Sequence, residues 1–86
     1  MIFAREHILS ERDRLDFAVI IPPGVLAIEV KIEKATVTNV ARQAQRYLAN
    51  PGVVGLILAT TSNRLAAQMP RELQSKPVYA LVLQRM

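Results

Sequence analysis

Two acidic residues and a lysine near the start of the chain have types and spacing suited to metal-assisted hydrolysis. Glu29 and Lys31 flank Val30 in the stretch LAIEVKIEKA. Asp16 precedes them by roughly the length of chain that forms one β-hairpin. The stretch alternates between aliphatic and other side chains, so Glu29 and Lys31 project from one face of a strand. Two carboxylates and a backbone carbonyl, here that of Val30, are hard oxygen ligands of the kind that Mg²⁺ takes. A lysine beside them can orient a water and offset charge that grows on a phosphate oxygen.

A hairpin is needed to bring Asp16 to Glu29. A turn about Pro22-Pro23 places Asp16 opposite Glu29, and it places Arg14 opposite Lys31. Like charges directly opposite each other are unfavourable, and a cation held between the two carboxylates removes that conflict. The alternative is that these charges are the solvated face of an ordinary amphipathic hairpin.

A second polar group lies in residues 37–49, VTNVARQAQRYLA, whose apolar residues recur at helical spacing. Gln43 and Tyr47 are four residues apart and share one side of the helix, with Arg46 one step around. A helix packed on the hairpin would direct Gln43 and Arg46 toward the carboxylates. A glutamine can hydrogen-bond a water or a phosphate, and an arginine can bind phosphate through two hydrogen bonds. Taken singly, each is also an ordinary helix former, and Tyr47 is an ordinary core residue.

The surrounding segments predict a single α/β domain over residues 1–86, because no linker or composition shift divides the chain. The expected fold is a small mixed β-sheet, an antiparallel hairpin plus a parallel strand, flanked by helices on one or both faces. A short N-terminal helix, or none, precedes it. The expected elements are strands over 15–21 (starting as early as Ile8) and 25–33, a helix over 37–49, a buried strand over 53–60, a short helix over 63–69 and a last strand over 77–83.

Together, Asp16, the EVK motif at 29–31 and the QAQRY motif at 43–47 resemble the PD-(D/E)XK nuclease superfamily with its QxxRY helix. The resemblance covers about residues 11–60. Within the superfamily, the chain is similar to small stand-alone members such as the VRR-type nucleases and the Holliday junction resolvases. The resemblance implies a restriction-endonuclease-like αβββαβ core and a homodimer.

The resemblance also implies a Mg²⁺-dependent DNA endonuclease, with Mn²⁺ as the other candidate metal. Two sites in a dimer would cut two strands, which suits a branched or palindromic DNA. The implied metal ligands are Asp16, Glu29 and the Val30 carbonyl; the implied catalytic residues are Asp16, Glu29, Lys31 and Gln43; the implied substrate-binding residues are Arg14, Arg46 and Tyr47.

Members of this superfamily usually have a first helix that contributes a further glutamate. Glu6, in FAREHIL, is the first candidate for this acid, and Glu11 is the second. Either is equally compatible with a solvated surface residue.

Composition narrows the function classes further. The chain has 86 residues, of which 51% are hydrophobic and 5% aromatic, so its thin core is expected to consist of Val, Ile, Leu and Ala. The absence of cysteine excludes disulfides and thiolate metal sites, and a single histidine, His7, excludes a His-rich zinc site. Apolar runs are too short to span a membrane, and the N-terminus lacks a signal-peptide core, so a cytoplasmic protein without membrane partners is expected. The net charge of +4 suits a polyanionic partner such as DNA.

Two other functions fit the same residues. A catalytically inactive nuclease fold would bind DNA without a metal and with a steep salt dependence. In a homodimeric interaction domain, the hairpin charges would be surface charges without a role in binding DNA or metal. Glu29→Ala would then leave both DNA affinity and metal affinity unchanged.

Overall fold

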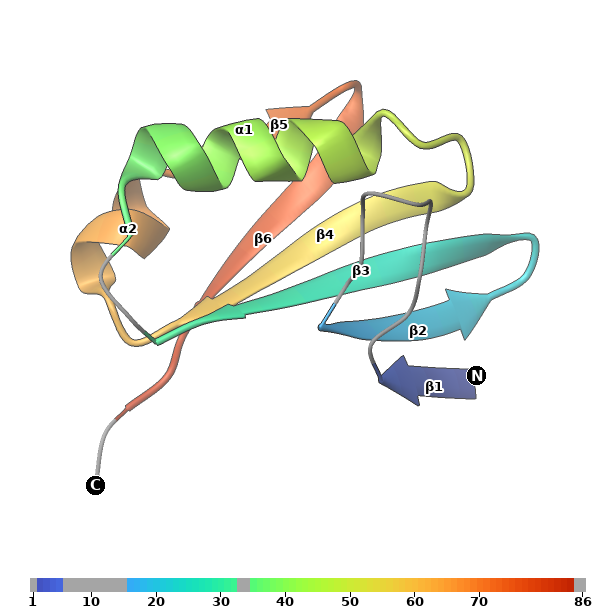
Figure 1. Ribbon diagram of the computed structural model, residues 1–86, viewed down its shortest axis with the longest axis horizontal. Coiled ribbons are helices and arrows are strands. Elements are labelled where there is room, and N and C mark those ends of the chain that lie inside the picture. The colour runs from blue at the N-terminus through green and yellow to red at the C-terminus, as the bar shows by residue number, and fades with distance from the viewer. Residues whose placement is uncertain (1, 6–15, 33–34, 85–86) are drawn as a thin grey trace.

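The computed structural model describes residues 2–5, 16–32 and 35–84. In this part of the chain, two helices accompany a mixed sheet with strand order β1-β2-β3-β4-β6-β5 (Figure 1). Neighbours β1, β2 and β3 pair antiparallel, β3, β4 and β6 pair parallel, and β5 pairs antiparallel with β6. The elements are β1 (Ile2–Arg5), β2 (Phe17–Ile21), β3 (Gly24–Lys31), α1 (Val37–Leu48), β4 (Val53–Thr60), α2 (Asn63–Gln68), β5 (Glu72–Leu73) and β6 (Lys76–Val82).

The expected hairpin and its register are confirmed. Phe17 lies opposite Ile28, and the pairing continues to the turn, where Pro22 and Pro23 are joined by a cis peptide bond. Gly24 follows the turn at a point where the backbone approaches β4 closely. A Cβ atom at Gly24 would collide with a methyl group of Val54, so any larger residue here forces Val54 to shift.

The crossover from β3 to β4 forms as expected from the helical period. Thr36 caps α1 by accepting a hydrogen bond from the Asn39 amide at 3.1 Å. At the other end, the Lys76 ammonium donates to the carbonyls of Leu48 and Asn50 at 2.8 and 3.0 Å. The Leu48 carbonyl is one that a helix end leaves without an intrahelical partner, and Asn50 follows just after the helix, so Lys76 ties β6 to the C-terminal end of α1.

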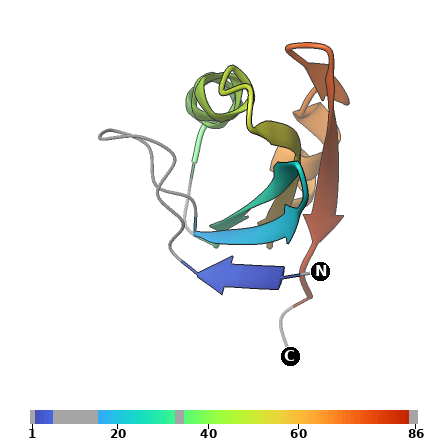
Figure 2. The same cartoon turned by 90° about the vertical axis from the view of Figure 1, so that its right-hand side faces the viewer.

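Both helices cover the same face of the sheet, and Figure 2 shows them on the concave side of its curvature. The covered face carries Ala18 and Ala27, each fully buried, and Glu29. The more apolar face of the hairpin, with Phe17 and Ile28, is turned away from the helices and stays half-buried. The covered face is therefore the one with small side chains, because alanines let a helix approach the strands closely.

Two short strands were not expected. β1 occupies Ile2–Arg5, where the sequence predicts a short helix or no element, and β5 has only two residues. The proposed early start of a strand near Ile8 lies outside the described residues. The other boundaries agree with expectation to within two residues. Among the described residues, no helix combines the length and apolar character needed to cross a membrane.

Candidate functional site

Glu29 is the centre of the candidate site. It lies on the helix-covered face of β3, next to Leu58 of β4, and is 4% exposed. It is the one buried charged side chain among the described residues. A carboxylate in such a place is expensive to desolvate unless it is paired and hydrogen-bonded, so its partners define the site.

Asp16 meets Glu29 at the open end of the hairpin. The Asp16 carboxylate accepts a hydrogen bond from the Val30 amide, with an Oδ2···N distance of 3.0 Å. In return, the Asp16 amide donates to the Glu29 carboxylate. The ladder between β2 and β3 begins at Phe17, so the Asp16 side chain supplies the acceptor that Val30 would otherwise lack. The two acids are thus fixed beside each other by backbone hydrogen bonds.

Lys31 approaches the same carboxylate. Its Nζ lies 3.6 Å from Glu29 Oε2, and the lysine side chain is 29% exposed whereas that of Glu29 is 6% exposed. The ammonium therefore stands between the buried carboxylate and solvent. Lys31 also lies beside Thr60 in the parallel ladder, at the carboxyl ends of β3 and β4.

Tyr47 supports Glu29 from the helix. The Tyr47 hydroxyl accepts a hydrogen bond from Gln43 Nε2 at 2.8 Å and is itself hydrogen-bonded to the Glu29 carboxylate. The predicted pairing of Gln43 with Tyr47 across one helical turn is confirmed. Tyr47 is only 2% exposed, so its geometry favours positioning of Glu29 over direct contact with a substrate.

The electrostatics show an incompletely compensated carboxylate. Burial, followed by the charge of Asp16, raises the pKa of Glu29, while Lys31 and the hydrogen bonds from the Asp16 amide and Tyr47 lower it by less. Burial, together with the Glu29 charge, also raises the pKa of Tyr47. A cation placed near Glu29 and Asp16 would relieve both the burial penalty and the mutual repulsion.

The donor set fits a hard divalent ion. The Val30 amide faces Asp16, and because N–H and C=O of one strand residue point to the same side, its carbonyl faces that side too. No group of three or more His, Cys, Asp or Glu side chains gathers within the described ranges. Mg²⁺ needs no such group, because it commonly uses one or two carboxylates and keeps several waters. Asp16, Glu29 and the Val30 carbonyl therefore provide oxygen ligands of the types that a Mg²⁺ site needs.

The remaining predicted site residues lie at the margin or outside the described residues. Arg46 is exposed on α1, and its charge lowers the pKa of Tyr47, which places it near the site. Arg14, Glu6 and Glu11 lie outside the described residues, so their predicted roles stay predictions.

Two contacts were missed by sequence reasoning. The hydrogen bond from the Val30 amide to Asp16 has no sequence signal beyond the end of the hairpin. Thr60 is fully buried beside Lys31 and accepts from the Ser62 amide at 3.1 Å. The run TTSN after a buried strand does indicate a polar strand end, and here it serves mainly to begin α2.

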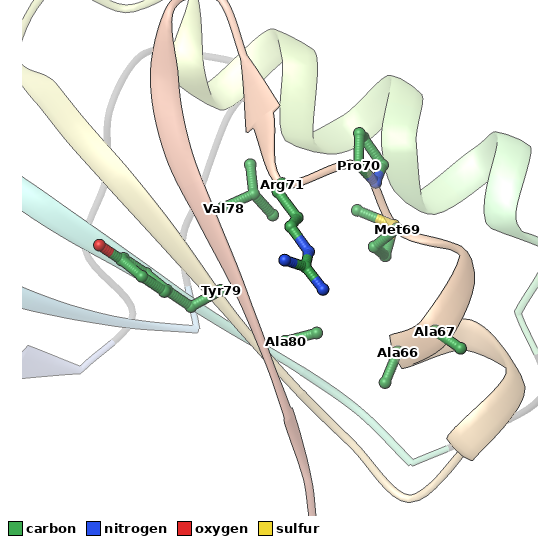
Figure 3. A pocket seen from close by; sticks show the side chains of 8 residues that line it. All are labelled: Ala66, Ala67, Met69, Pro70, Arg71, Val78, Tyr79 and Ala80. Carbon is green, nitrogen blue, oxygen red and sulfur yellow. The ribbon is translucent and has the colours of Figure 1, made fainter.

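A separate depression of about 460 Å³ lies between α2 and β6 (Figure 3). Apolar side chains such as Ala66, Met69 and Val78 line it together with polar groups, and the Arg71 side chain lies across it. None of the predicted site residues lines it, so the depression is not part of the acidic site.

No family model matches the chain, and no curated protein or solved structure matches it either. The interpretation of the site therefore depends on the contacts of Glu29 and on the motifs that surround it.

Proposed function

We propose that the protein is a Mg²⁺-dependent DNA endonuclease with a restriction-endonuclease-like core. The observation that carries the proposal is the buried Glu29 carboxylate, held beside Asp16 and within 3.6 Å of the Lys31 ammonium. Buried ionisable groups with perturbed pKa values gather at functional sites more often than elsewhere, and burial and Asp16 raise the pKa of Glu29. A charged side chain without a functional role would be expected to lie in solvent.

Asp16, Glu29 and the Val30 carbonyl would hold the Mg²⁺, and Mn²⁺ suits the same oxygen donors. When bound, the metal lowers the pKa of a water and so makes a nucleophile at neutral pH. The rigid hydrogen bonds of Asp16 and Glu29 keep the donors in place before the substrate arrives. Such preorganisation avoids rearrangement during the reaction.

Lys31 is suited to the substrate side of the site because its ammonium reaches solvent. It can orient the attacking water toward the phosphorus atom and offset negative charge on the phosphate oxygens. Gln43 and Tyr47 hold the Glu29 carboxylate in its orientation, and Arg46 can bind a phosphate oxygen from the exposed surface of α1. In a dimer, two such sites would suit a branched DNA.

Cleavage assays test this proposal. Labelled linear, flapped and four-way DNA would be incubated with Mg²⁺, with Mn²⁺ and with EDTA. Glu29→Gln and Lys31→Ala should abolish cutting. The matched control is Glu72→Gln, an exposed acid on β5, which should cut like the wild type.

Binding data separate the rival functions. If the wild type never cuts but binds DNA equally well with EDTA, the DNA-binding module replaces the nuclease. If Glu29→Gln also leaves DNA affinity and Mg²⁺ affinity unchanged, the hairpin charges have no role in either.

A further inference from the structure

The outer edge of β6 is open beyond Val78. β5 pairs with β6 only at Lys76 and Pro77, and the Arg71 carbonyl then accepts from the Val78 amide at 3.0 Å. In the described part of the chain, no strand pairs with this edge beyond Val78. An unpaired strand edge is a template for another strand.

The direction of the backbone groups along β6 follows from two hydrogen bonds. The Val78 amide points outward to Arg71, and the Leu83 amide points inward to the Thr60 carbonyl at 2.7 Å. Because direction alternates along a strand, Ala80 and Val82 also point outward. Each therefore offers one N–H and one C=O at the open edge.

From Val78 to Leu83 the side chains of the chain segment at this edge are uncharged, and the charged group beside them is the Arg71 guanidinium, across the depression that Ala80 lines (Figure 3). Tyr79 and Leu81, 59% and 55% exposed, project from the face of the sheet that no described helix covers. Figure 3 shows Tyr79 pointing away from the depression that Val78 and Ala80 line. The edge sequence YALVL carries none of the charged or proline residues that usually protect an edge strand.

We propose that two copies of the chain pair through β6 as antiparallel strands, with the twofold axis at Leu81. Ala80 then pairs with Val82 of the second copy, and Val82 with its Ala80. These two pairs form four hydrogen bonds and use every outward group of both residues. Leu81 packs against Leu81 of the second copy at the close, non-hydrogen-bonded position, and Tyr79 lies opposite Leu83 of the second copy.

The hydrogen bond between Val78 and Arg71 favours this register over the one centred on Ala80. A dimer centred on Ala80 would place Val82 of the second copy opposite Val78, where the Arg71 carbonyl already occupies the amide. Centring on Leu81 instead places Gln84 of the second copy, which lies beyond the last residue of β6, opposite Val78, so both hydrogen-bonded pairs form clear of the Arg71 carbonyl. The pairing is self-complementary, satisfies two open edges at once, brings no like charges together and covers the exposed Leu81 of both copies, which favours a second copy as the occupant.

This arrangement bears on the proposed nuclease, and this step rests on that function. A twofold axis perpendicular to the sheet keeps both helix-covered faces on one side. Glu29, Leu58 and Ala80 lie in one row, so five strand spacings separate the two Glu29 residues, about 24 Å across the combined sheet. Two sites would face one DNA.

A cysteine crosslink tests the interface without metal or DNA. The chain has no native cysteine, so Leu81→Cys introduces a single thiol whose partner would lie at the twofold axis. Mild oxidation should convert it to a disulfide-linked dimer. Ile32→Cys, equally exposed at 57% but at the end of β3, is the matched control and should stay reduced.

Sedimentation equilibrium gives the second readout. Leu81→Lys should raise the dimer dissociation constant about 100-fold or more, since two leucines are lost and two lysines oppose each other. A wild type that stays monomeric at millimolar concentration overturns the proposal. So does a dimer in which Ile32→Cys crosslinks as readily as Leu81→Cys. Cleavage by a monomer would refute the interface alone, and a crosslinked dimer without cleavage would refute the nuclease alone.

Discussion

Replacing Tyr47 with phenylalanine removes one oxygen atom that serves two hydrogen bonds and leaves the shape of the core intact. The hydroxyl binds the buried Glu29 carboxylate and accepts from Gln43 at 2.8 Å. A hydrogen bond to a charged group is worth about 1.5–3 kcal/mol, and Gln43 is half-buried, so water can replace its lost partner. We expect Tyr47→Phe to lower the free energy of unfolding by about 2 kcal/mol at pH 7. For a domain of this size, that is a fall in Tm of about 8 to 16 °C.

Urea unfolding at several pH values is the assay, with Tyr79→Phe as the control because that hydroxyl belongs to a 59% exposed side chain. The control should change stability by less than about 0.5 kcal/mol. The loss in Tyr47→Phe should shrink toward about 1 kcal/mol below the raised pKa of Glu29, where the carboxyl is neutral. Equal, pH-independent losses in the two variants would refute the idea that Tyr47 stabilises a charged Glu29.

Further predictions concern charge, metal and packing. Because the pKa of Glu29 is raised in the folded protein, metal-free stability should fall as the pH rises above 4.5 through the folded pKa; Glu29→Gln should flatten that profile in urea melts, and an unchanged profile would contradict this. Mg²⁺ at about ten times its Kd should raise wild-type stability by about 1.4 kcal/mol in thermal melts, with no shift in Glu29→Gln and a full shift in Glu72→Gln. Lys76→Met should cost about 1.5–3 kcal/mol in urea unfolding because two hydrogen bonds to the end of α1 are lost, whereas Arg71→Met should cost little. Gly24→Ala should lower Tm by an amount equivalent to about 1–3 kcal/mol, since the new methyl group meets Val54; an unchanged Tm would mean that the turn yields without strain.

The hairpin register could be predicted because parity is strongly constrained. If β3 slipped by one residue against β2, Leu26 and Ile28 would move to the face that Ala27 and Glu29 occupy. Only pairings of one parity therefore keep the two faces distinct. That constraint also predicted the meeting of Asp16 with Glu29. The role of the Asp16 carboxylate as a ladder-ending acceptor was not predictable, because it depends on where β2 begins.

Which face of the hairpin the helix covers could not be read from hydrophobicity. The face with Phe17 and Ile28 is the more apolar, yet α1 covers the face with Ala18 and Ala27. Close packing of a helix against strands favours small side chains, and that steric preference prevails over the apolar content of single residues.

The helix contacts were predictable only in part. Spacing along α1 pairs Gln43 with Tyr47 whatever the helix packs on. The contact of Tyr47 with Glu29 depends on the rotation of α1 over the sheet, which no local pattern specifies. The β5–β6 hairpin was missed for a different reason: Gln74 and Ser75 adopt φ values of 54° and 60° without the glycine or asparagine that usually marks such a turn.

The position of Glu29 argues for a function that involves charge. A leucine there would pack beside Leu58 and below α1 without desolvating a carboxylate, and replacing a buried charge by an apolar residue is often neutral or stabilising. The surrounding residues instead stabilise a charge at this position, because the Asp16 amide, Lys31 and Tyr47 all favour the ionised form of Glu29. Together these three partners keep one carboxylate charged and in a fixed orientation, which a leucine would not need and which a metal site does need. The same partners do not neutralise it fully, since the net shift in the pKa of Glu29 is upward, and the remaining attraction for a cation is what a bound Mg²⁺ would satisfy.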